Sequence, residues 1–334
     1  MTFIDLFCGA GGMSLGLQDA GFSAELGIDI DPMSIRTYTK NVSEAKLMSV
    51  SELTTADIPV GIDVIVGGPP CQGFSKQRKG AADGNDPRNA LLKDFCRVIV
   101  EVRPAAFILE NVAVFGQKRG KDLLSEMKGE LDFYGYEFFP HFYNCADYGL
   151  AQTRERFVLV GTEGFEFTPP EPTVDEWQTV KMHIGDLPSP PEDYSDDPEL
   201  PNHQAARVTS KNIERISHVP PGGDWRDIPH DLRLACHQRI DENTPGGWTD
   251  VYGRLQWDGQ APTLTGGFDS FTRGRYAHPE EDRPLTPREG ARLQGFPDWF
   301  KFFGTRADWR RQIGNAVPPP LATAIGKSLK EAMS

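Results

Sequence analysis

The stretch Gly67-Gly68-Pro69-Pro70-Cys71-Gln72-Gly73-Phe74-Ser75 follows directly on an apolar run, Val64–Val66. The run predicts a buried parallel strand, and two prolines cannot continue a central strand, so the chain must leave the sheet there. Ligands of doubly wound α/β folds bind just beyond the carboxyl ends of the strands. A thiol among glycines at that point, Cys71, lies where a nucleophile would be, although an inert, packed cysteine is the commoner fate of this residue type.

Apolar runs alternate with longer amphipathic segments over the first half of the chain, which is typical of βαβ units. The segment Asp86–Arg103 predicts a helix, because its apolar residues recur at helical spacing. The predicted fold is α/β, a Rossmann-like, doubly wound sheet with helices on both faces. Its expected strands are Thr2–Phe7, Ala24–Ile28, Val64–Val66, Ala106–Leu109 and Phe157–Gly161.

A proline-rich, poorly periodic segment from about Thr168 to Leu264 breaks this pattern and predicts a smaller, irregular domain. Helical patterning returns over Pro284–Leu293 and Leu321–Ala332. We therefore predict a first domain over residues 1–180, completed by residues 308–334, and a second domain with a hinge over residues 181–307.

Charge and cysteine content narrow the classes of protein. The net charge is −13, but eleven carboxylates and one lysine lie between Glu163 and Glu199, so charge neither supports nor excludes a nucleic-acid partner. The five cysteines are scattered, which argues for reduced thiols in a cytoplasm and against disulfides or a metal site. With no membrane-length apolar run and no room for a signal peptide before the first expected strand, we expect a cytoplasmic protein without membrane association.

A glycine-rich turn, Gly9-Ala10-Gly11-Gly12, follows the first expected strand. Glycines between a strand and a helix let backbone N–H groups approach a ligand, and Asp29 at the end of the next strand suits a ribose diol. Ser14 stands where a dinucleotide fingerprint has its third glycine. A tight turn without a ligand therefore remains an alternative.

Three further polar stretches can carry chemistry. Glu110 ends a buried strand, where a carboxylate must be desolvated or paired; a helix N-terminal acid is the alternative. In Gln152-Thr153-Arg154-Glu155-Arg156, alternation places Gln152, Arg154 and Arg156 on one face, where arginine can bind a base oxygen or a phosphate or simply form surface ion pairs. The basic, glycine-punctuated segment Gln72–Asn89 predicts either a lid over phosphates or an ordinary solvated loop.

Taken in this order, the blocks resemble the DNA (cytosine-5) methyltransferase family of bacterial or phage type. The likeness runs from Thr2 to about Gly326 and is interrupted only in the irregular middle region. The blocks that carry it are Asp5–Gly12, Pro69–Gln72, Glu110–Val112, Gln152-x-Arg154-x-Arg156, Pro284–Asp298 and Gly314–Val317.

The resemblance implies an S-adenosylmethionine-dependent methyltransferase sheet with a target-recognition domain. Asp29 would hold the ribose of the cofactor, and Ile30 would pack on its adenine. Ser49 stands where the family often has an acid facing the adenine amine, so the contact to that edge is not assigned. The implied cofactor-binding residues are Phe7, Gly9, Gly11, Asp29, Ile30, Pro70, Leu91, Asn315 and Val317.

The resemblance further implies methyl transfer to carbon 5 of a cytosine flipped out of a specific duplex DNA sequence. Cys71 would add to carbon 6, Glu110 would neutralise charge at ring N3, and Arg156, helped by Arg154, would hold the carbonyl at position 2. Thr263 is expected to hold the backbone of the flipped nucleotide. The implied DNA-binding residues are Gln72, Ser75, Lys76, Arg78, Lys79, Thr263, Arg273 and Arg275.

Three rival functions remain open. A nicotinamide enzyme explains Gly9 and Asp29 but leaves Glu110 and Arg156 without roles. An RNA cytosine-5 methyltransferase of this family usually carries a Cys-Phe-Thr tripeptide, which this sequence lacks. A catalytically silent DNA-binding relative would not need Cys71. We expect a monomer, with a cognate restriction endonuclease as a genetic rather than a necessary physical partner.

Overall fold

The computed structural model describes residues 1–70, 87–240 and 250–334. The chain divides into two compact units. Unit 1 comprises Met1–Tyr148, Glu155–Asp175 and Ala316–Ser334, and unit 2 comprises Gly149–Arg154 and Glu176–Asn315. Residues 149–154, 176–180 and 308–315, which the sequence had placed in the first domain, belong to unit 2. The reason is that residues 149–154 are hydrogen-bonded to the main chain of unit 2, as described below for Gln152 and Arg154.

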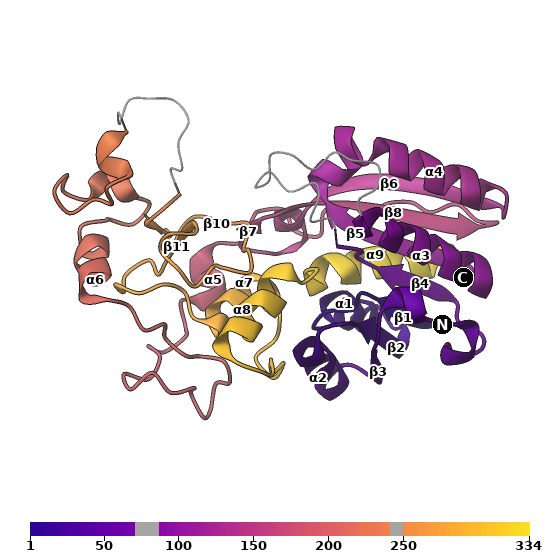
Figure 1. Ribbon diagram of the computed structural model, residues 1–334, viewed down its shortest axis with the longest axis horizontal. Helices are drawn as coiled ribbons and strands as arrows, with labels where there is room; N and C mark the ends of the chain where they lie inside the picture. Colours follow the sequence, from indigo (N-terminus) through magenta and orange to yellow (C-terminus); the bar gives the residue numbers. More distant parts are fainter. Residues whose placement is uncertain (71–86, 241–249) are drawn as a thin grey trace. The chain divides into compact units, whose positions relative to one another are not determined.

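Unit 1 contains a seven-stranded sheet in the order β3-β2-β1-β4-β5-β8-β6 (Figure 1). The first five of these strands are parallel, and β8 runs antiparallel to both β5 and β6. All five strands expected from the sequence are present. The bounds are β1 Thr2–Leu6, β2 Ser23–Asp29, β3 Ala45–Leu47, β4 Val64–Gly67, β5 Ala106–Val112, β6 Tyr136–Asn144 and β8 Glu155–Glu163.

Two strands were missed, because neither has the pattern of a buried strand. β3 is only three residues long and mostly exposed. β6 lies at the edge of the sheet and contains Pro140 within a largely exposed run. Edge strands tolerate both proline and polar residues, so periodicity does not reveal them.

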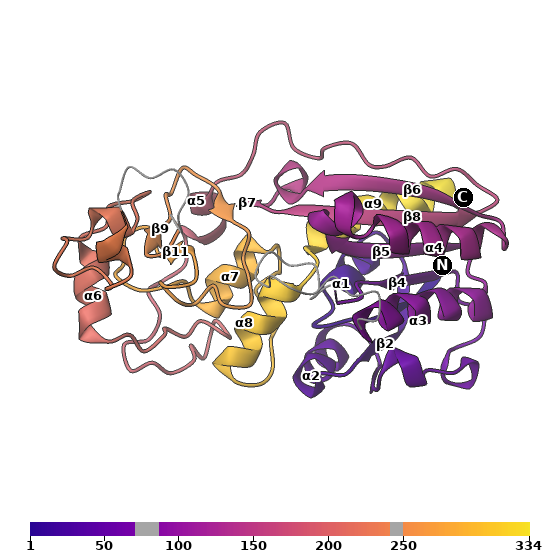
Figure 2. The same cartoon turned by 45° about the horizontal axis from the view of Figure 1, so that its top comes forward.

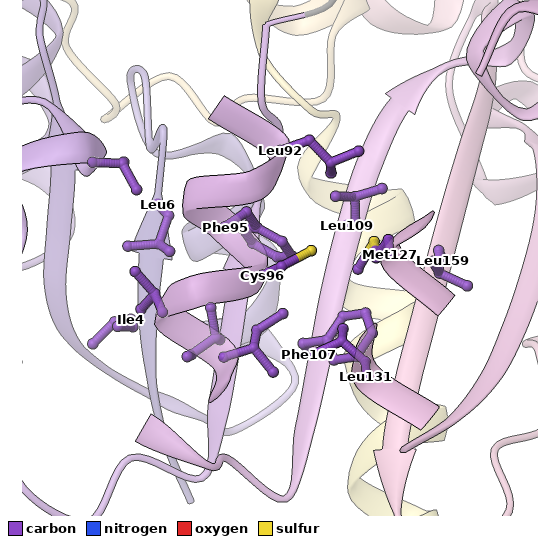
Figure 3. Close-up of a cluster of buried hydrophobic side chains, with 14 of the residues drawn as sticks. Ile4, Leu6, Leu92, Phe95, Cys96, Phe107, Leu109, Met127, Leu131 and Leu159 are labelled. Atoms are coloured by element: carbon purple, nitrogen blue, oxygen red, sulfur yellow. The ribbon is translucent and has the colours of Figure 1, made fainter. Parts of the chain in front are cut away.

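The residues of β5 alternate between the two faces of the sheet. Phe107 and Leu109 pack against α3 (Pro87–Val102) and α4 (Lys121–Asp132), where Figure 3 shows them beside Phe95 and Leu131. Ile108 and Glu110 face a pocket lined from α1 (Gly12–Asp19) and α9 (Pro319–Ala332). Glu110 therefore lies on the α1/α9 side, and residues of the C-terminal helix form part of its surroundings. Figure 2 shows α9 beside β5 and β8.

Helices α1 and α9 lie in close contact because α1 has a glycine, Gly16, at the point where they meet. A Cβ built at Gly16 of α1 would lie 2.3 Å from the Pro319 carbonyl oxygen and 2.6 Å from the Ala322 Cβ. Lys330, near the end of α9, donates from Nζ to the carbonyl of Gly21 at 3.1 Å. The chain returns to unit 1 for its last helix, and α9 completes this face of the sheet.

Unit 2 contains little regular structure. Its elements are β7 Gln152–Thr153 paired with β10 Ala261–Pro262, β9 Gly253–Arg254 paired with β11 Arg275–Ala277, and helices α5 Val180–Ile184, α6 Ser210–Ser217, α7 Pro287–Leu293 and α8 Arg306–Asn315. Carbonyl groups outside helices and sheets need other donors when they are buried. Arg254 supplies all five of its N–H donors, four of them to carbonyl oxygens and one to the Asp282 carboxylate.

We predict that Gly16→Ala destabilises unit 1, because the new methyl group meets main-chain atoms of α9 that cannot rotate away. The expected loss in free energy of unfolding is about 1–3 kcal/mol. Gly129→Ala is the matched control, since a Cβ at Gly129 of α4 meets no described atom within 4 Å. It should stabilise the helix by about 0.5–1 kcal/mol. Urea unfolding measures both, and equal effects of the two substitutions would contradict the close helix contact.

Candidate active site

Three predicted functional stretches meet at one edge of the sheet. Because β1, β4 and β5 are parallel neighbours, with Leu6 opposite Gly67 and Gly67 opposite Leu109, their carboxyl ends lie together. The glycine-rich turn follows β1, Pro69 and Pro70 follow β4, and Glu110 lies near the end of β5. Cys71 comes next after Pro70 but lies outside the described residues, as do Gln72, Ser75, Lys76, Arg78 and Lys79.

The glycine-rich turn has a backbone that only a few residue types adopt readily. Phe7, Gly9 and Gly11 have φ values of 65°, 51° and 96°. A Cβ at Gly9 would meet no described atom within 4 Å, so this face of the turn is open to a ligand. The N–H of Gly9 donates to Asp29 Oδ2 at 2.9 Å, which ties the turn to the end of β2.

Asp29 is fixed by backbone donors on both oxygens, since Asp31 N donates to Oδ1 at 2.9 Å. Burial raises the pKa of Asp29 above its ordinary value, and these hydrogen bonds oppose that shift. A carboxylate oxygen can accept a second hydrogen bond, so Asp29 can still accept hydroxyl groups from a ligand. The next residue, Ile30, is 74% exposed and offers an apolar surface beside it.

A buried polar cluster lies behind this turn, and the sequence did not reveal it. Ser14 donates to the carboxyl of Asp5, and its hydroxyl also lies 2.9 Å from the Tyr38 hydroxyl. Burial raises the pKa of Asp5 to about 7, with a smaller contribution from the charge of Asp29. Ser14 is the residue that replaces the third glycine of a dinucleotide fingerprint, and here it binds the carboxyl group at the base of the turn.

The remaining predicted cofactor residues occupy varied surroundings. Pro70 and Asn315 are exposed, whereas Leu91 and Val317 are half-buried. Ser49, where an acid was expected to face an adenine, caps a short 3₁₀ helix, Val50–Glu52. The main-chain N–H of Ser49 is in turn bonded to Glu52, so both side chains serve this cap.

Glu110 and Arg156 form a nearly buried ion pair. Arg156 Nε lies 2.7 Å from Glu110 Oε1, and the side chains are 10% and 12% exposed. Arg156 Nη1 also donates to the carbonyl of Glu155. Removing one partner of a buried ion pair leaves the other charge buried without compensation, which lowers the stability of the protein. The prediction that Glu110 must be paired or desolvated is therefore confirmed, with Arg156 as its partner.

The carboxylate of Glu110 is closely surrounded. A Cβ at Gly68 would lie 3.2 Å from Glu110 Oε2, so only glycine leaves this approach clear. Asn111 donates from Nδ2 to the carbonyl of Pro69 at 3.1 Å and thereby connects β5 to the segment that leads to Cys71. Apolar side chains line a small pocket together with Glu110: Met13, Leu17, Ile108, Val158, Val317, Ala322 and Ile325.

The alternating stretch before β8 is divided between two tasks. Gln152, Arg154 and Arg156 are all buried, as alternation predicts, but Arg154 does not accompany Arg156. Arg154 donates to the carbonyls of Leu264 at 2.8 Å and Gly314 at 3.1 Å, both within unit 2. Gln152 accepts from the Leu264 N–H at 2.8 Å. The Arg154 guanidinium thus binds main chain, and its help in holding a base carbonyl stays a prediction.

Two predicted DNA contacts prove to be engaged within unit 2. Thr263 donates from Oγ1 to the Thr153 carbonyl at 2.9 Å, and its own carbonyl accepts from Tyr276. Arg275 Nη1 donates to the carbonyls of Gly222 and Gly223, both at 2.7 Å, and to that of Arg254. The Arg275 fork thus holds the main chain of the unit, and its contact with DNA stays a prediction. Arg273 is exposed.

Two further kinds of site were sought in the part of the chain that the structure describes. It contains no group of three or more His, Cys, Asp or Glu side chains arranged to hold a metal ion. In the same residues, no helix has both the length and the apolar character needed to cross a membrane.

Asp5→Asn is predicted to remove a pH-dependent loss of stability. Asp5 has a pKa of about 7 in the folded protein against 3.8 ordinarily, so the folded state binds more protons between these values. Stability therefore falls as pH rises from about 4 to 7 and is flat above. At 1.36 kcal/mol per unit, the variant should gain about 2–3 kcal/mol over the wild type between pH 5 and pH 8.

Urea unfolding of both proteins at the two pH values measures this gain. Asp132→Asn, at an exposed carboxylate on the surface of unit 1, is the control and should change equally little at both. A gain for Asp5→Asn that does not depend on pH would contradict the assignment.

Comparison with known proteins matches the chain to one family. Residues 1–331 match the family model for the C-5 cytosine-specific DNA methylase. Type II methyltransferase M1.HphI of Haemophilus parahaemolyticus is 37% identical over 339 residues, which cover 98% of this chain and 86% of that protein. Type II methylase M.HgiDII of Herpetosiphon aurantiacus is 35% identical over 344 residues, covering 98% and 94%.

Solved structures agree with the fold class predicted from the sequence. A protein described as a DNA modification methyltransferase encoded within an E. coli prophage has a TM-score of 0.76 at 27% identity, covering 100% of this chain and 99% of that one. The Dnmt2 methyltransferase of S. pombe shares the fold, with a TM-score of 0.64 at 20% identity, covering 99% of each chain. Since the family model spans nearly the whole sequence, the chain belongs to the C-5 cytosine-specific DNA methylase family: it is a DNA (cytosine-5-)-methyltransferase whose methyl donor is S-adenosylmethionine.

Proposed function

We propose that this enzyme methylates a cytosine flipped out of a specific duplex DNA sequence, through a covalent bond between Cys71 and carbon 6 of the base. The observation that carries the proposal is the buried Glu110–Arg156 pair, held at the same sheet edge as the segment that leads to Cys71. Asn111 connects the two through the Pro69 carbonyl. An acid, a fixed guanidinium and a thiol at one strand edge are what an addition to a pyrimidine ring requires.

The chemistry follows from the weakness of carbon 5 as a nucleophile. Addition of the Cys71 thiolate forms a sulfur–carbon 6 bond and moves a ring electron pair onto N3, which takes a proton from the Glu110 carboxyl group. The resulting enamine is nucleophilic at carbon 5, and S-adenosylmethionine supplies the electrophilic methyl group. Loss of the carbon 5 proton to a water molecule then breaks the bond to Cys71, which leaves as a thiolate, and the proton on N3 returns to Glu110 as the aromatic ring is restored.

The ion pair leaves groups available to the base. Within the described residues, neither Glu110 Oε2 nor Arg156 Nη2 takes part in a hydrogen bond, while Glu110 Oε1 and Arg156 Nε hold each other. Arg156 would therefore donate to the carbonyl at position 2, and Glu110 would bind N3 and the exocyclic amine. Such a pair fixes the orientation of a flipped cytosine as well as its charge.

The turn after β1 fits the cofactor. Gly9 leaves its face open, Asp29 has acceptor capacity for a ribose diol, and Ile30 offers an exposed apolar surface for an adenine. We assign Phe7, Gly11, Pro70, Leu91, Asn315 and Val317 to the same site. Asp5 lies beneath this turn, where its carboxylate would favour a cationic ligand.

The substrate is proposed to be duplex DNA, with base flipping as the first step, because the ring cannot be reached inside a helix. The basic residues Lys76, Arg78 and Lys79 are proposed to contact phosphates. The similarity to Type II methyltransferases supports a role in a restriction-modification system, with an endonuclease as genetic partner. RNA remains the alternative substrate, and competition between duplex DNA and transfer RNA distinguishes the two.

Cys71→Ser should abolish methylation while cofactor and DNA binding persist, because a hydroxyl is a far weaker nucleophile than a thiolate. Labelled methyl groups are transferred to mixed-sequence duplex DNA, and the digested nucleosides are identified. Wild type should yield 5-methylcytosine and the variant none. Cys236→Ser, at an exposed cysteine of unit 2, is the control and should retain activity. Methylation by Cys71→Ser near the wild-type rate would refute the covalent mechanism.

Glu110→Gln should lower the methylation rate by about 100-fold or more, because an amide cannot supply the proton that a carboxyl group can. Since a buried partner of Arg156 is altered, thermal unfolding must accompany the rate measurement. The control is Glu155→Gln, at an exposed carboxylate in β8, the strand that carries Arg156; it should leave the rate unchanged. Equal single-turnover rates for Glu110→Gln and wild type would remove the acid role.

A further inference from the structure

Most arginines of unit 2 are unavailable to DNA. Arg154, Arg254, Arg275 and Arg288 donate to main-chain carbonyls. Others pair with carboxylates, namely Arg226, Arg283, Arg292, Arg306 and Arg310. Their charges therefore contribute to the stability of an irregular fold. An arginine that recognises a base must keep its guanidinium free for the nucleic acid.

Arg273 meets this condition. It is exposed, and no hydrogen bond or ion pair within the described residues uses its guanidinium. Its side chain lies across the main chain of Gly267: a Cβ there would be 2.5 Å from Arg273 Cδ and 2.8 Å from Nη1. We call Gly267 the seat, because its main chain without a Cβ packs against the Arg273 side chain and, within the described residues, accepts none of its N–H donors.

The turn that carries Arg273 is held firmly on both sides. The N–H of Arg273 donates to the Ser270 carbonyl at 3.2 Å. Before it, the buried Phe271 ring stacks on Tyr252 with centroids 5.7 Å apart. After it, Arg275 holds the carbonyls of Gly222 and Gly223. The backbone at Arg273 is therefore fixed by its two neighbours.

The seat is equally well anchored. Phe268, next to Gly267, is fully buried, and its ring lies where a Cβ of Gly290 in α7 would be. The Asp269 carboxylate binds Arg306 and Arg310 of α8. Both the arginine and its support are thus rigidly attached to the two helices and the core of unit 2.

We propose that Arg273 is a specificity-determining residue that recognises a guanine of the target sequence by donating to N7 and O6 in the major groove. This rests on the proposed function and names a contact within it. Guanine is the base that offers two acceptors matched to the arginine fork. A guanidinium that is already packed against a fixed backbone loses less conformational entropy on binding than a mobile one.

Two other exposed arginines of unit 2 have partners within the unit. Arg207 lies over the ring of Tyr194, with 4.8 Å from its guanidinium carbon to the ring centroid, and Arg226 is bonded to Asp224 through two nitrogens. Binding DNA would require either side chain to give up a partner. Among the described residues, Arg273 has no hydrogen-bond or ion-pair partner that its guanidinium would have to release.

Arg273→Lys is the first test, because lysine keeps the charge for a phosphate but lacks the planar fork for guanine. Purified enzyme methylates a library of duplexes with randomised flanks, and sequencing maps the methylated cytosines. Wild type should show a recognition sequence containing guanine. The variant should lose preference for guanine at one position by about tenfold or more. Arg207→Lys is the matched control and should keep the wild-type preference.

Gly267→Ala tests the seat with Arg273 in place. The φ of Gly267 is not in the left-handed region, and the three atoms nearest to the new methyl group would all belong to the Arg273 side chain, which can move. The variant should therefore fold and bind S-adenosylhomocysteine as wild type does, yet lose preference at the same guanine position.

Two results would overturn the inference while leaving the proposed function intact: an unchanged recognition sequence in both variants, or an equal loss of methylation at all sequences, which indicates a phosphate contact. Absence of DNA methylation by the wild type would refute the proposed function and this inference with it.

Discussion

The parallel direction of β1, β4 and β5 is the constraint on which the site depends. Three stretches that are distant in sequence reach the same sheet edge only because these strands all end there. Their direction also makes the site independent of any single loop: the open turn at Gly9 and the carboxylate of Glu110 are placed by hydrogen-bonded strands. Asn111 also contributes, because its hydrogen bond to the Pro69 carbonyl fixes the point where the chain leaves β4 toward Cys71.

The antiparallel strand β8 adds what a purely parallel sheet could not. It returns beside β5 with Val158 opposite Glu110, which brings Arg156 alongside the acid from the opposite chain direction. The strand order and the pairing of the buried Glu110 side chain are therefore linked. The mostly apolar pocket around Glu110 strengthens this link, because few polar groups there can substitute for Arg156.

Sequence periodicity was sufficient for the strands of the sheet core and for helices α3, α7 and α9, because burial on one face or both leaves a repeating pattern. It was also sufficient to place Glu110 and the glycine-rich turn. It could not separate Arg154 from Arg156, which share one face of the chain; only their tertiary partners distinguish a main-chain clamp from a site residue. The Asp5–Ser14–Tyr38 cluster was invisible for a similar reason, since its members lie on three different elements.

In unit 2 the same residue type serves two opposite purposes, and composition cannot tell them apart. A domain with few strands leaves many carbonyls to be satisfied, and arginine, with five donors in a rigid fork, is the side chain best suited to this task. A fold built in this way consumes its own basic residues, so an arginine count overstates the surface available to DNA. Arg273 differs because Gly267 has no side chain, so its side chain can pack directly against the Gly267 main chain. Within the described residues, no acceptor binds the guanidinium donors of Arg273. A long side chain is usually either held by partners or mobile. At Arg273 the side chain is held by packing while its guanidinium donors remain available to DNA.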